Sequence, residues 1–311
     1  MCGIAALQLR NPALRDELGV LMHGMLCEIV ERGPDSAGLA VYGDRTLNPD
    51  GTAVLTLLGH DGEPEALREQ LASVLPSSSG VEVEPRGDTT IVRAGVATEE
   101  LEAAVETFLP GVGIAGRGTG VTVMKGVGNP RDLAETFHLR EATGLQGVSH
   151  TRMATESAVT AGGAHPFTVA DDLCLVHNGS FSNHVSIRRR LEAEGVRFDS
   201  ENDSEVAARY IARRLEQGDD LETALAHLGE VLDGFYTLVV TTATSMAVVR
   251  DPIACKPAII AETDDWVAMA SEYRALAGLP GIEDARIFEP APGIAYTWTL
   301  STPADKEANV R

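Results

Sequence analysis

Short runs of alternating or β-branched apolar residues, bounded by Gly, Pro or Asp, recur along the chain and predict strands. The expected strands are Gly3–Leu9, Gly38–Tyr42, Gly120–Lys125, Gly147–Thr151, Leu173–His177, Phe235–Thr242, Met246–Val249, Pro257–Ala261, Trp266–Ala270 and Ile294–Leu300. Apolar residues at helical spacing predict helices over Asp16–Glu31, Glu65–Leu75, Glu99–Phe108, Pro130–Phe137, His184–Ala193, Ser204–Gln217 and Leu221–Leu232. Helices come in groups instead of alternating with strands, which favours an α+β fold over a doubly wound parallel sheet.

Residues of about 52–118 differ from the remainder of the chain. The segment Pro76-Ser77-Ser78-Ser79-Gly80 separates two strand–helix segments that carry no concentrated polar chemistry. We therefore expect one domain over residues 2–300 with an inserted subdomain at about 52–118 that serves docking rather than catalysis. The polar residues 301–311 are expected to form a mobile C-terminal tail.

Composition narrows the classes of function. The 311-residue chain has 25 basic and 46 acidic residues and a formal charge of −21. Because an acidic surface repels nucleic-acid phosphates, we expect no nucleic-acid partner. No apolar run approaches the roughly 20 residues that span a bilayer, and no secretion signal is visible, so we expect no membrane partner. Cys2, Cys27, Cys174 and Cys255 show neither disulfide nor metal-ligand spacing. These features predict a cytoplasmic protein without a metal site, in which the last three cysteines are inert core residues.

Cys2 is the most informative residue of the chain. If Met1 is removed, Cys2 carries both a thiol, which titrates near about pH 8.5, and an α-amine, which titrates near about pH 8. One residue would then hold a nucleophile and a base. The alternative is a small apolar residue that opens the first strand, and the first six residues alone leave both interpretations open.

Three further segments supply the residue types that attack on a carboxamide requires. They are His150-Thr151-Arg152-Met153-Ala154-Thr155, His177-Asn178-Gly179 and Asn202-Asp203-Ser204-Glu205. Amide and backbone N–H groups can stabilise a tetrahedral oxyanion, and charged side chains can hold an amino-acid substrate.

Together with Cys2, these segments resemble the class II, N-terminal-nucleophile (Ntn) glutamine amidotransferases along nearly the whole chain. The resemblance is also carried by Arg32–Gly38, Lys125–Gly128, Ala164–Phe167, Arg250–Ile253, Lys256-Pro257, Ala270–Glu272 and Pro292-Gly293. It implies a four-layer αββα Ntn-hydrolase sandwich with two stacked antiparallel sheets. It also implies a glutaminase domain to which no acceptor-enzyme domain is attached.

A finer resemblance is to the free-standing amidotransferase-like subunits of N-methylglutamate synthase (methylamine–glutamate N-methyltransferase) and similar split glutamate-synthase systems. It is carried by residues His150–Pro166, which include Thr155–Thr160, and by Asp251–Pro257. This resemblance implies L-glutamine or L-glutamate as the substrate, and FMN-binding and glutamate-synthase-like partner subunits. It implies no cofactor on this chain, with FMN on a partner.

The family resemblance assigns the chemistry to three residues. Cys2 would be the nucleophile and its own α-amine the base, directly or through one water. The side-chain amide of Asn178 and the backbone N–H of Gly179 would be the oxyanion donors. Asn-Gly is also a strong signal for a type I′ hairpin turn, and we expect both interpretations to hold.

The resemblance assigns substrate contacts to further residues. Arg152 would bind the α-carboxylate of glutamine; its alternative is a surface ion pair. Asp203 would accept the α-ammonium; its alternative is a helix N-cap. Thr155 would make a secondary contact, or be a buried strand threonine. Arg32 and Gly38 would shape the pocket around the nucleophile.

Other residues receive structural interpretations. His165 and His177 have no metal-ligand spacing, so structural hydrogen bonds are expected of them. The glycine-rich segment 116–120 lacks the residues of a phosphate loop and is expected to be a turn. Several relatives carry an aromatic residue in place of Met153, and others a His in place of Glu156. These departures bear on closure over the substrate and on coupling to an ammonia channel, but not on the core chemistry. Two other functions stay open: a glutamine- or glutamate-binding regulatory subunit without turnover, and an independent Ntn amidase.

Overall fold

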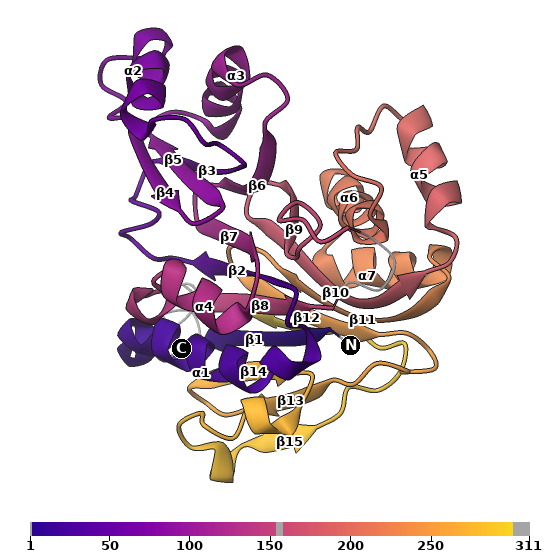
Figure 1. The fold of residues 1–311 in the computed structure, drawn as a ribbon. Coiled ribbons are helices and arrows are strands. Elements are labelled where there is room, and N and C mark those ends of the chain that lie inside the picture. Colours follow the sequence, from indigo (N-terminus) through magenta and orange to yellow (C-terminus); the bar gives the residue numbers. More distant parts are fainter. Residues whose placement is uncertain (1, 154–157, 301–311) are drawn as a thin grey trace, which may run out of the picture.

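Two layers of helices enclose two stacked antiparallel sheets in the computed structural model, which describes residues 2–153 and 158–300 (Figure 1). The order from one side to the other is helix, sheet, sheet, helix, with an apolar cluster between each pair of layers. The expected α+β, four-layer αββα sandwich is therefore confirmed.

The first sheet has the strand order β15-β13-β14-β1-β8-β2-β7, with neighbouring strands antiparallel. Its strands are β1 (Gly3–Leu9), β2 (Ser36–Tyr42), β7 (Val121–Val127), β8 (Gln146–Arg152), β13 (Ile259–Glu262), β14 (Trp266–Ala270) and β15 (Arg286–Phe288). Ala5 and Leu7 of β1 pack in the cluster that contains helix α1 (Leu18–Glu28), whereas Ile4 and Ala6 face the second sheet. Both faces of β1 are thus buried, which explains its continuous apolar run.

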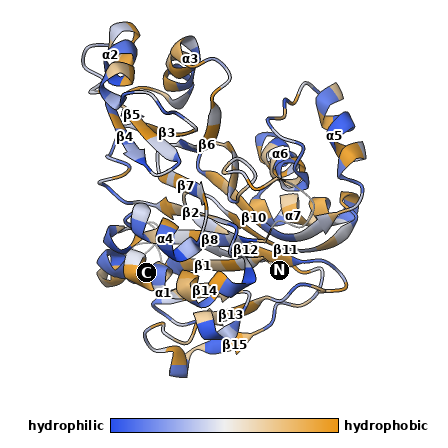
Figure 2. Ribbon diagram, viewed as in Figure 1, coloured by the Kyte–Doolittle hydropathy of each residue, from blue (hydrophilic) through white to orange (hydrophobic). Residues whose placement is uncertain are grey.

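The second sheet has the strand order β16-β12-β11-β10-β9. Its strands are β9 (Phe167–Ala170), β10 (Leu173–Phe181), β11 (Gly234–Thr241), β12 (Ser245–Arg250) and β16 (Tyr296–Thr299). Val176, Val239 and Val248 meet the first sheet in the inter-sheet cluster. The outer face carries α5 (His184–Ala193), α6 (Asp203–Glu216) and α7 (Leu221–Val231). Figure 2 shows apolar residues recurring along the stacked strands, while hydrophilic residues gather on α5.

The remaining elements complete the outer face of the first sheet. Helix α4 (Pro130–Thr136) packs beside α1, and short 3₁₀ helices occur at Pro12–Glu17, Val30–Arg32, Leu139–Glu141, Tyr273–Ala275 and Ile282–Asp284. The α-helix expected over Asp16–Glu31 forms only over Leu18–Glu28. The chain on either side of it adopts the tighter 3₁₀ conformation, which is frequent at helix ends. No helix in the described ranges has the length and apolarity to cross a bilayer.

Residues 53–118 form a third sheet that is separate from the stacked pair, with strand order β4-β5-β3-β6. Its elements are β3 (Ala53–Leu58), α2 (Pro64–Val74), β4 (Glu82–Arg86), β5 (Thr89–Ala94), α3 (Thr98–Phe108) and β6 (Gly113–Gly118). Leu55, Leu71, Val92 and Leu101 belong to an apolar cluster of its own. In Figure 1 this subdomain rises from the edge of the first sheet, where β6 contacts β7.

The segment 116–120 is not the simple turn that its glycines predict. Strand β6 continues to Gly118, and the bend that follows wraps around the carboxylate of Asp172. Asp172 Oδ1 accepts hydrogen bonds from the backbone N–H groups of Thr119 (3.1 Å) and Gly120 (2.8 Å). The amides that could have bound a phosphate are therefore satisfied by the protein itself, and they tie the third sheet to the β9–β10 connection.

Candidate active site

Strand register brings Cys2 next to Arg152 at the open end of the sandwich. Gly3 of β1 pairs with Thr151 of β8, so the next position along the register sets Cys2 beside Arg152. Because side chains alternate along a strand, Cys2 points to the same face as Ile4, which lies in the inter-sheet core. The thiol therefore faces the second sheet.

Two side chains hold the backbone of Cys2. The carbonyl oxygen of Cys2 accepts a hydrogen bond from Arg32 Nε (2.9 Å) and another from Asn178 Nδ2 (2.9 Å). Arg32 Nη1 is in turn fixed by Glu272 at 2.8 Å, and this hydrogen bond lowers the pKa of Glu272. Cys2 Sγ lies 3.9 Å from the carbonyl oxygen of Met153. Cys2, Arg32 and Asn178, far apart in the sequence, thus meet in space.

Asn178 and Gly179 lie inside strand β10 and do not form the predicted hairpin turn. Asn178 pairs with Thr237 and Gly179 with Tyr236, so pairing across the sheet overrides the local Asn-Gly signal. Gly179 has a φ of +148°, and a Cβ there would lie 2.0 Å from the carbonyl oxygen of Phe235. Only glycine fits at this position.

Gly38 also permits a close approach of two backbones. It pairs with Lys125 of β7 on one side and with His150 of β8 on the other. A Cβ at Gly38 would lie 2.1 Å from the carbonyl oxygen of His165. Residue 38 therefore sets how closely the segment that carries His165 approaches the first sheet.

Asp203 is the first residue of α6 rather than its N-cap. The cap is Asn202, whose side-chain oxygen accepts from the backbone N–H of Ser204 at 2.9 Å. The N-cap alternative for Asp203 is therefore wrong. Asp203 Oδ2 instead accepts from the backbone N–H of Phe181 at 2.9 Å, which joins the helix to the end of β10.

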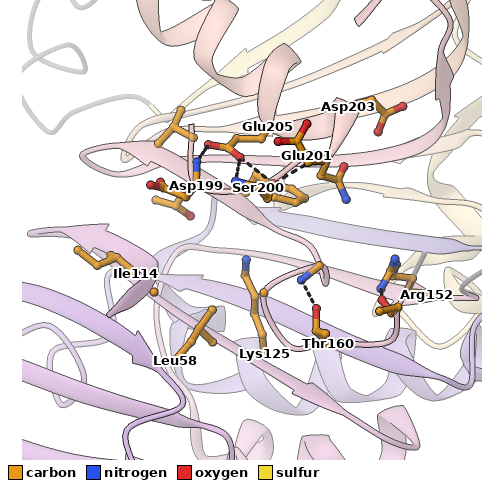
Figure 3. Close-up of a pocket in the computed structure, with 18 of the residues that line it drawn as sticks. Leu58, Ile114, Lys125, Arg152, Thr160, Asp199, Ser200, Glu201, Asp203 and Glu205 are labelled. Atoms are coloured by element: carbon orange, nitrogen blue, oxygen red, sulfur yellow. Dashed lines mark hydrogen bonds between the residues drawn. The ribbon is translucent and has the colours of Figure 1, made fainter. Parts of the chain in front are cut away.

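A cavity of about 680 Å³ lies between the first sheet, the third sheet and the N-terminus of α6 (Figure 3). Arg152 and Asp203 both line it, and Leu58 forms part of the wall from the third sheet. The described residues that line this cavity do not include Cys2. The nominated residues thus form two neighbouring groups, one around the thiol and one in the cavity. Thr155 lies outside the described residues.

Three buried histidines connect these groups. His165 Nε2 and His177 Nδ1 lie 2.9 Å and 2.8 Å from the hydroxyl oxygen of Ser204, and His150 Nε2 lies 3.2 Å from the carbonyl oxygen of His177. Burial lowers the pKa of His150 to about 3 and of His177 to about 4, and lowers the pKa of His165 well below its usual value. All three are neutral at pH 7, in agreement with the structural role expected of His165 and His177.

Lys125 is a site residue to which sequence reasoning gave no role. It is 3% exposed on β7, lines the cavity, and holds its Nζ 5.0 Å from the centre of the Phe167 ring. Burial lowers its pKa to about 8. The signal in the sequence was a lysine at the end of the apolar run Val121–Met124, where a lysine is rarely buried without a reason.

The cysteines outside the site differ in exposure. Cys174 is buried, and burial raises the pKa of its thiol to about 11. Cys27 is partly exposed and Cys255 is exposed. The expectation of an inert core residue is therefore wrong for Cys255, which lies in the loop after β12. Within the described ranges, no group of three or more His, Cys, Asp or Glu side chains is arranged to hold a metal ion.

Burial of Lys125 predicts an unusual titration. The chain contains Lys125, Lys256 and Lys306, so ¹³Cε-lysine labelling gives separable NMR signals. We expect one signal with a midpoint near pH 8 instead of the ordinary 10.5, and Lys125→Met should remove it. Between these pH values the unfolded chain binds the proton more tightly, so stability should rise with pH in the wild type and not in Lys125→Met. Three signals that all titrate near 10.5 would contradict the burial.

Comparisons with known proteins identify the family. Residues 150–278 match a family model described as a glutamine amidotransferase domain. The chain is 46% identical over 301 residues to the glutamine amidotransferase-like protein GlxB of Rhizobium meliloti (strain 1021), covering 96% of this chain and 98% of that protein. It is 30% identical over 281 residues to a putative glutamine amidotransferase of Methanothermobacter thermautotrophicus, covering 88% and 92%.

Solved structures agree on the fold. Glutamine phosphoribosylpyrophosphate amidotransferase from B. subtilis aligns with a TM-score of 0.59 at 19% identity, over 97% of this chain and 50% of that one. The structure of an allosteric regulatory enzyme of purine biosynthesis aligns with a TM-score of 0.61 at 18% identity, over 97% of this chain and 49% of that one. The chain thus spans about half the length of these two structures. The two relatives that match over nearly their whole length, together with the four-layer fold, show that this chain belongs to the class II glutamine amidotransferase family.

Proposed function

We propose that this chain hydrolyses the side-chain amide of L-glutamine at Cys2 and delivers the ammonia to a partner enzyme. The observation that carries the proposal is the position of Cys2. Its carbonyl is held by Asn178 and Arg32, and its register places it beside Arg152. A nucleophile, an amide donor and a guanidinium therefore converge at one end of the sandwich.

In the proposed reaction, the thiolate of Cys2 attacks the amide carbon of glutamine. The α-amine of Cys2 takes the thiol proton and returns it to the leaving nitrogen, so that ammonia departs and a γ-glutamyl thioester remains. Water then hydrolyses the thioester to glutamate and regenerates the thiol. The reaction requires removal of Met1, because a retained Met1 would acylate the amine that serves as the base.

Stabilisation of the tetrahedral oxyanion is assigned to Asn178 and Gly179. The Asn178 amide nitrogen carries two hydrogens, and its hydrogen bond to the Cys2 carbonyl uses one of them. In the described part of the second sheet, β9 pairs with β10 only as far as Leu175, so β10 has no strand neighbour on that side at Gly179. Loss of one such donor typically costs about 2.7–4 kcal/mol in the transition state.

Substrate binding is assigned to Arg152 and Asp203. A planar guanidinium matches an α-carboxylate, and an ionised carboxylate retains acceptor capacity for an α-ammonium beyond its bond from Phe181 N–H. Both side chains line the same cavity, which supports the assignment. Arg32 and Gly38 are assigned to the shape of the nucleophile pocket, and a contact from Thr155 remains a prediction.

The acceptor we propose is an N-methylglutamate synthase-type assembly with FMN-binding and glutamate-synthase-like subunits. There, methylamine and glutamate would be joined into N-methylglutamate with release of ammonia. This exchange would consume the ammonia from Cys2 when it runs in the opposite direction, from N-methylglutamate and ammonia to glutamate and methylamine. The proposal rests on the resemblance of His150–Pro166 and Asp251–Pro257 to that branch. FMN is expected on a partner, because this sequence carries no flavin fingerprint. Ammonia released into bulk water would be protonated, which favours a docked acceptor.

Cys2→Ala is expected to abolish ammonia release from glutamine by the assembled complex. The matched control is Cys255→Ala, because Cys255 is exposed and outside the site. Intact mass spectrometry should show Cys2 as the first residue of the active chain. Equal ammonia release by wild type and Cys2→Ala would overturn the catalytic role. Turnover of simple amides but not of glutamine would favour an independent amidase. Glutamine binding without any turnover would favour a regulatory subunit.

The partner assignment predicts co-purification with a flavin-containing subunit and a glutamate-synthase-like subunit. The complex should form N-methylglutamate from methylamine and glutamate, with FMN bound outside this chain. Cys2→Ala serves as the control, because this variant should co-purify normally while it loses only the release of ammonia from glutamine. Isolation of the chain from its native cell without flavin in any associated subunit would refute this partnership.

A further inference from the structure

A second thiol, outside the candidate active site, lies beside an imidazole and a carboxylate. Cys27 and His23 are one turn apart on α1, and Cys27 Sγ is 3.7 Å from His23 Nδ1 and 3.8 Å from His23 Nε2. His23 Nε2 lies 3.2 Å from Oε1 of Glu135 on α4, the helix beside α1 (Figure 1). Helix α1 packs on the face of the first sheet opposite to the one that Cys2 faces, so this group is separate from the proposed nucleophile.

The contact with Glu135 sets which nitrogen of His23 carries the hydrogen. An ionised carboxylate only accepts hydrogen bonds, so His23 Nε2 donates to Glu135. The neutral ring then has its lone pair on Nδ1, the nitrogen nearer to Cys27 Sγ. His23 is buried and Cys27 is partly exposed, so the base is held in place while the thiol can be reached. A thiol with a base beside it, and a third group that orients the base, is the arrangement of an activated nucleophile.

A cation lies at the helix end that carries Cys27. Cys27 is the next-to-last residue of α1, where the negative end of the helix dipole disfavours a thiolate. Arg131 Nη2 donates a hydrogen bond to the carbonyl oxygen of Cys27 at 3.2 Å. The guanidinium of Arg131 therefore opposes the dipole close to the thiol.

Cys27 and His23 both line a cavity of about 730 Å³ between α1 and the segment 274–279. Two guanidiniums, those of Arg140 and Arg274, belong to the same wall, and the one carboxylate among the described lining residues is that of Glu28. In a chain with a net charge of −21, this is a local surplus of positive charge. The cavity therefore favours an anionic ligand next to the thiol.

The two arginines keep hydrogen-bonding capacity for such a ligand. Their side chains are 55% and 44% exposed. The nearest atoms in their ion pairs are Nε of Arg140 with Glu135, and Nε and Nη1 of Arg274 with Glu272 and Glu31. Because a guanidinium has five N–H donors, each arginine can also bind a carboxylate that enters the cavity.

The surroundings of Cys27 suit thiol–disulfide exchange better than acyl transfer. Acyl transfer requires N–H donors aimed at a developing oxyanion. The backbone N–H groups beside Cys27 are bonded within the last turn of α1 and are not available for that task. Thiol–disulfide exchange requires a thiolate, access to it, and a proton for the leaving thiolate. Cys27 and His23 can supply all three.

We propose that Cys27 is a modification site that exchanges with a low-molecular-weight disulfide bearing carboxylates. His23 takes the thiol proton, the Cys27 thiolate attacks one sulfur of the disulfide, and a bond to that sulfur forms as the S–S bond of the small molecule breaks. The departing thiolate takes the proton from His23 and leaves as a thiol. Cys27 is oxidised and the departing half is reduced, so no other oxidant is needed.

Oxidised glutathione is a disulfide of this class whose size and charge fit the cavity. The half that stays on Cys27 has roughly 20 non-hydrogen atoms and needs on the order of 600 Å³ at the volume of liquid water per atom, against about 730 Å³ in the cavity. Each half carries two carboxylates, and the wall offers the guanidiniums of Arg140 and Arg274.

The test incubates the full chain with oxidised glutathione at pH 7 and measures the mixed disulfides at Cys27 and Cys255 by peptide mass spectrometry. We expect Cys27 to react about tenfold or more faster than Cys255, because a base lies beside Cys27, although Cys255 is the more exposed thiol. With cystamine, a cationic disulfide, the ratio of the two rates should be at least about threefold lower, because the arginines no longer attract the reagent.

Two variants test the base. His23→Gln should slow Cys27 about tenfold, leave Cys255 unchanged, and make the pH dependences of the two rates parallel. Glu135 is 67% exposed, so Glu135→Gln tests the same base without a change in the core, and it should slow Cys27 at least about threefold and shift its pH dependence towards that of Cys255. His227→Gln is the matched control, because it breaks a contact to a carboxylate (Glu230, 3.3 Å) on α7, in the other helix layer.

Three results would overturn the inference: a Cys27 rate no higher than that of Cys255 in the wild type, an unchanged Cys27 rate in both His23→Gln and Glu135→Gln, or a rate ratio that is not lower with cystamine. The test does not depend on turnover. The Cys2→Ala chain should give the same rate at Cys27, so loss of the proposed glutaminase function would leave this site standing.

Discussion

The carbonyl oxygen of Cys2 is the point on which the candidate active site depends. It receives Arg32 Nε from the segment after α1 and Asn178 Nδ2 from the second sheet. The first residues of a chain lose conformational entropy when they are ordered, so the proposed nucleophile needs specific bonds to stay in place. A charge-assisted bond from Arg32, itself fixed by Glu272, supplies one of them.

The stacked sheets make this convergence possible. Because β1 has buried neighbours on both faces, its register against β8 is fixed and the side of the sheet that Cys2 faces is fixed with it. Glycines at 38 and 179 let neighbouring backbones approach to distances that any side chain would prevent. The outcome is a site assembled from β1, β2, β8, β10, α6 and the 3₁₀ helix Val30–Arg32, with a cavity between the first sheet, the third sheet and α6.

Much of the scaffold could be predicted from local pattern. Strand β1 has the predicted bounds Gly3–Leu9, and α2 and α3 begin within one residue of expectation, because an apolar run or an amphipathic face decides each of them. Local signals failed where long-range contacts decide. In isolation the Asn178-Gly179 pair favours a turn. Pairing with β11 instead keeps both residues in the extended strand β10. The sequence placed Lys125 at the end of an apolar run, but no local pattern indicated that it would be buried with no ion pair to another described residue. The bond from Asn178 to Cys2 spans 176 positions, so only a family resemblance could nominate both residues.

A glutamine analogue with a diazo ketone in place of the amide tests the central claim most directly, because it alkylates only a thiol that attacks a bound substrate. Peptide mass spectrometry of the labelled assembly should place one adduct per chain on a peptide that begins with Cys2, and excess L-glutamine should suppress it. An adduct on Cys255, an adduct on a peptide that retains Met1, or no adduct at all would contradict the account.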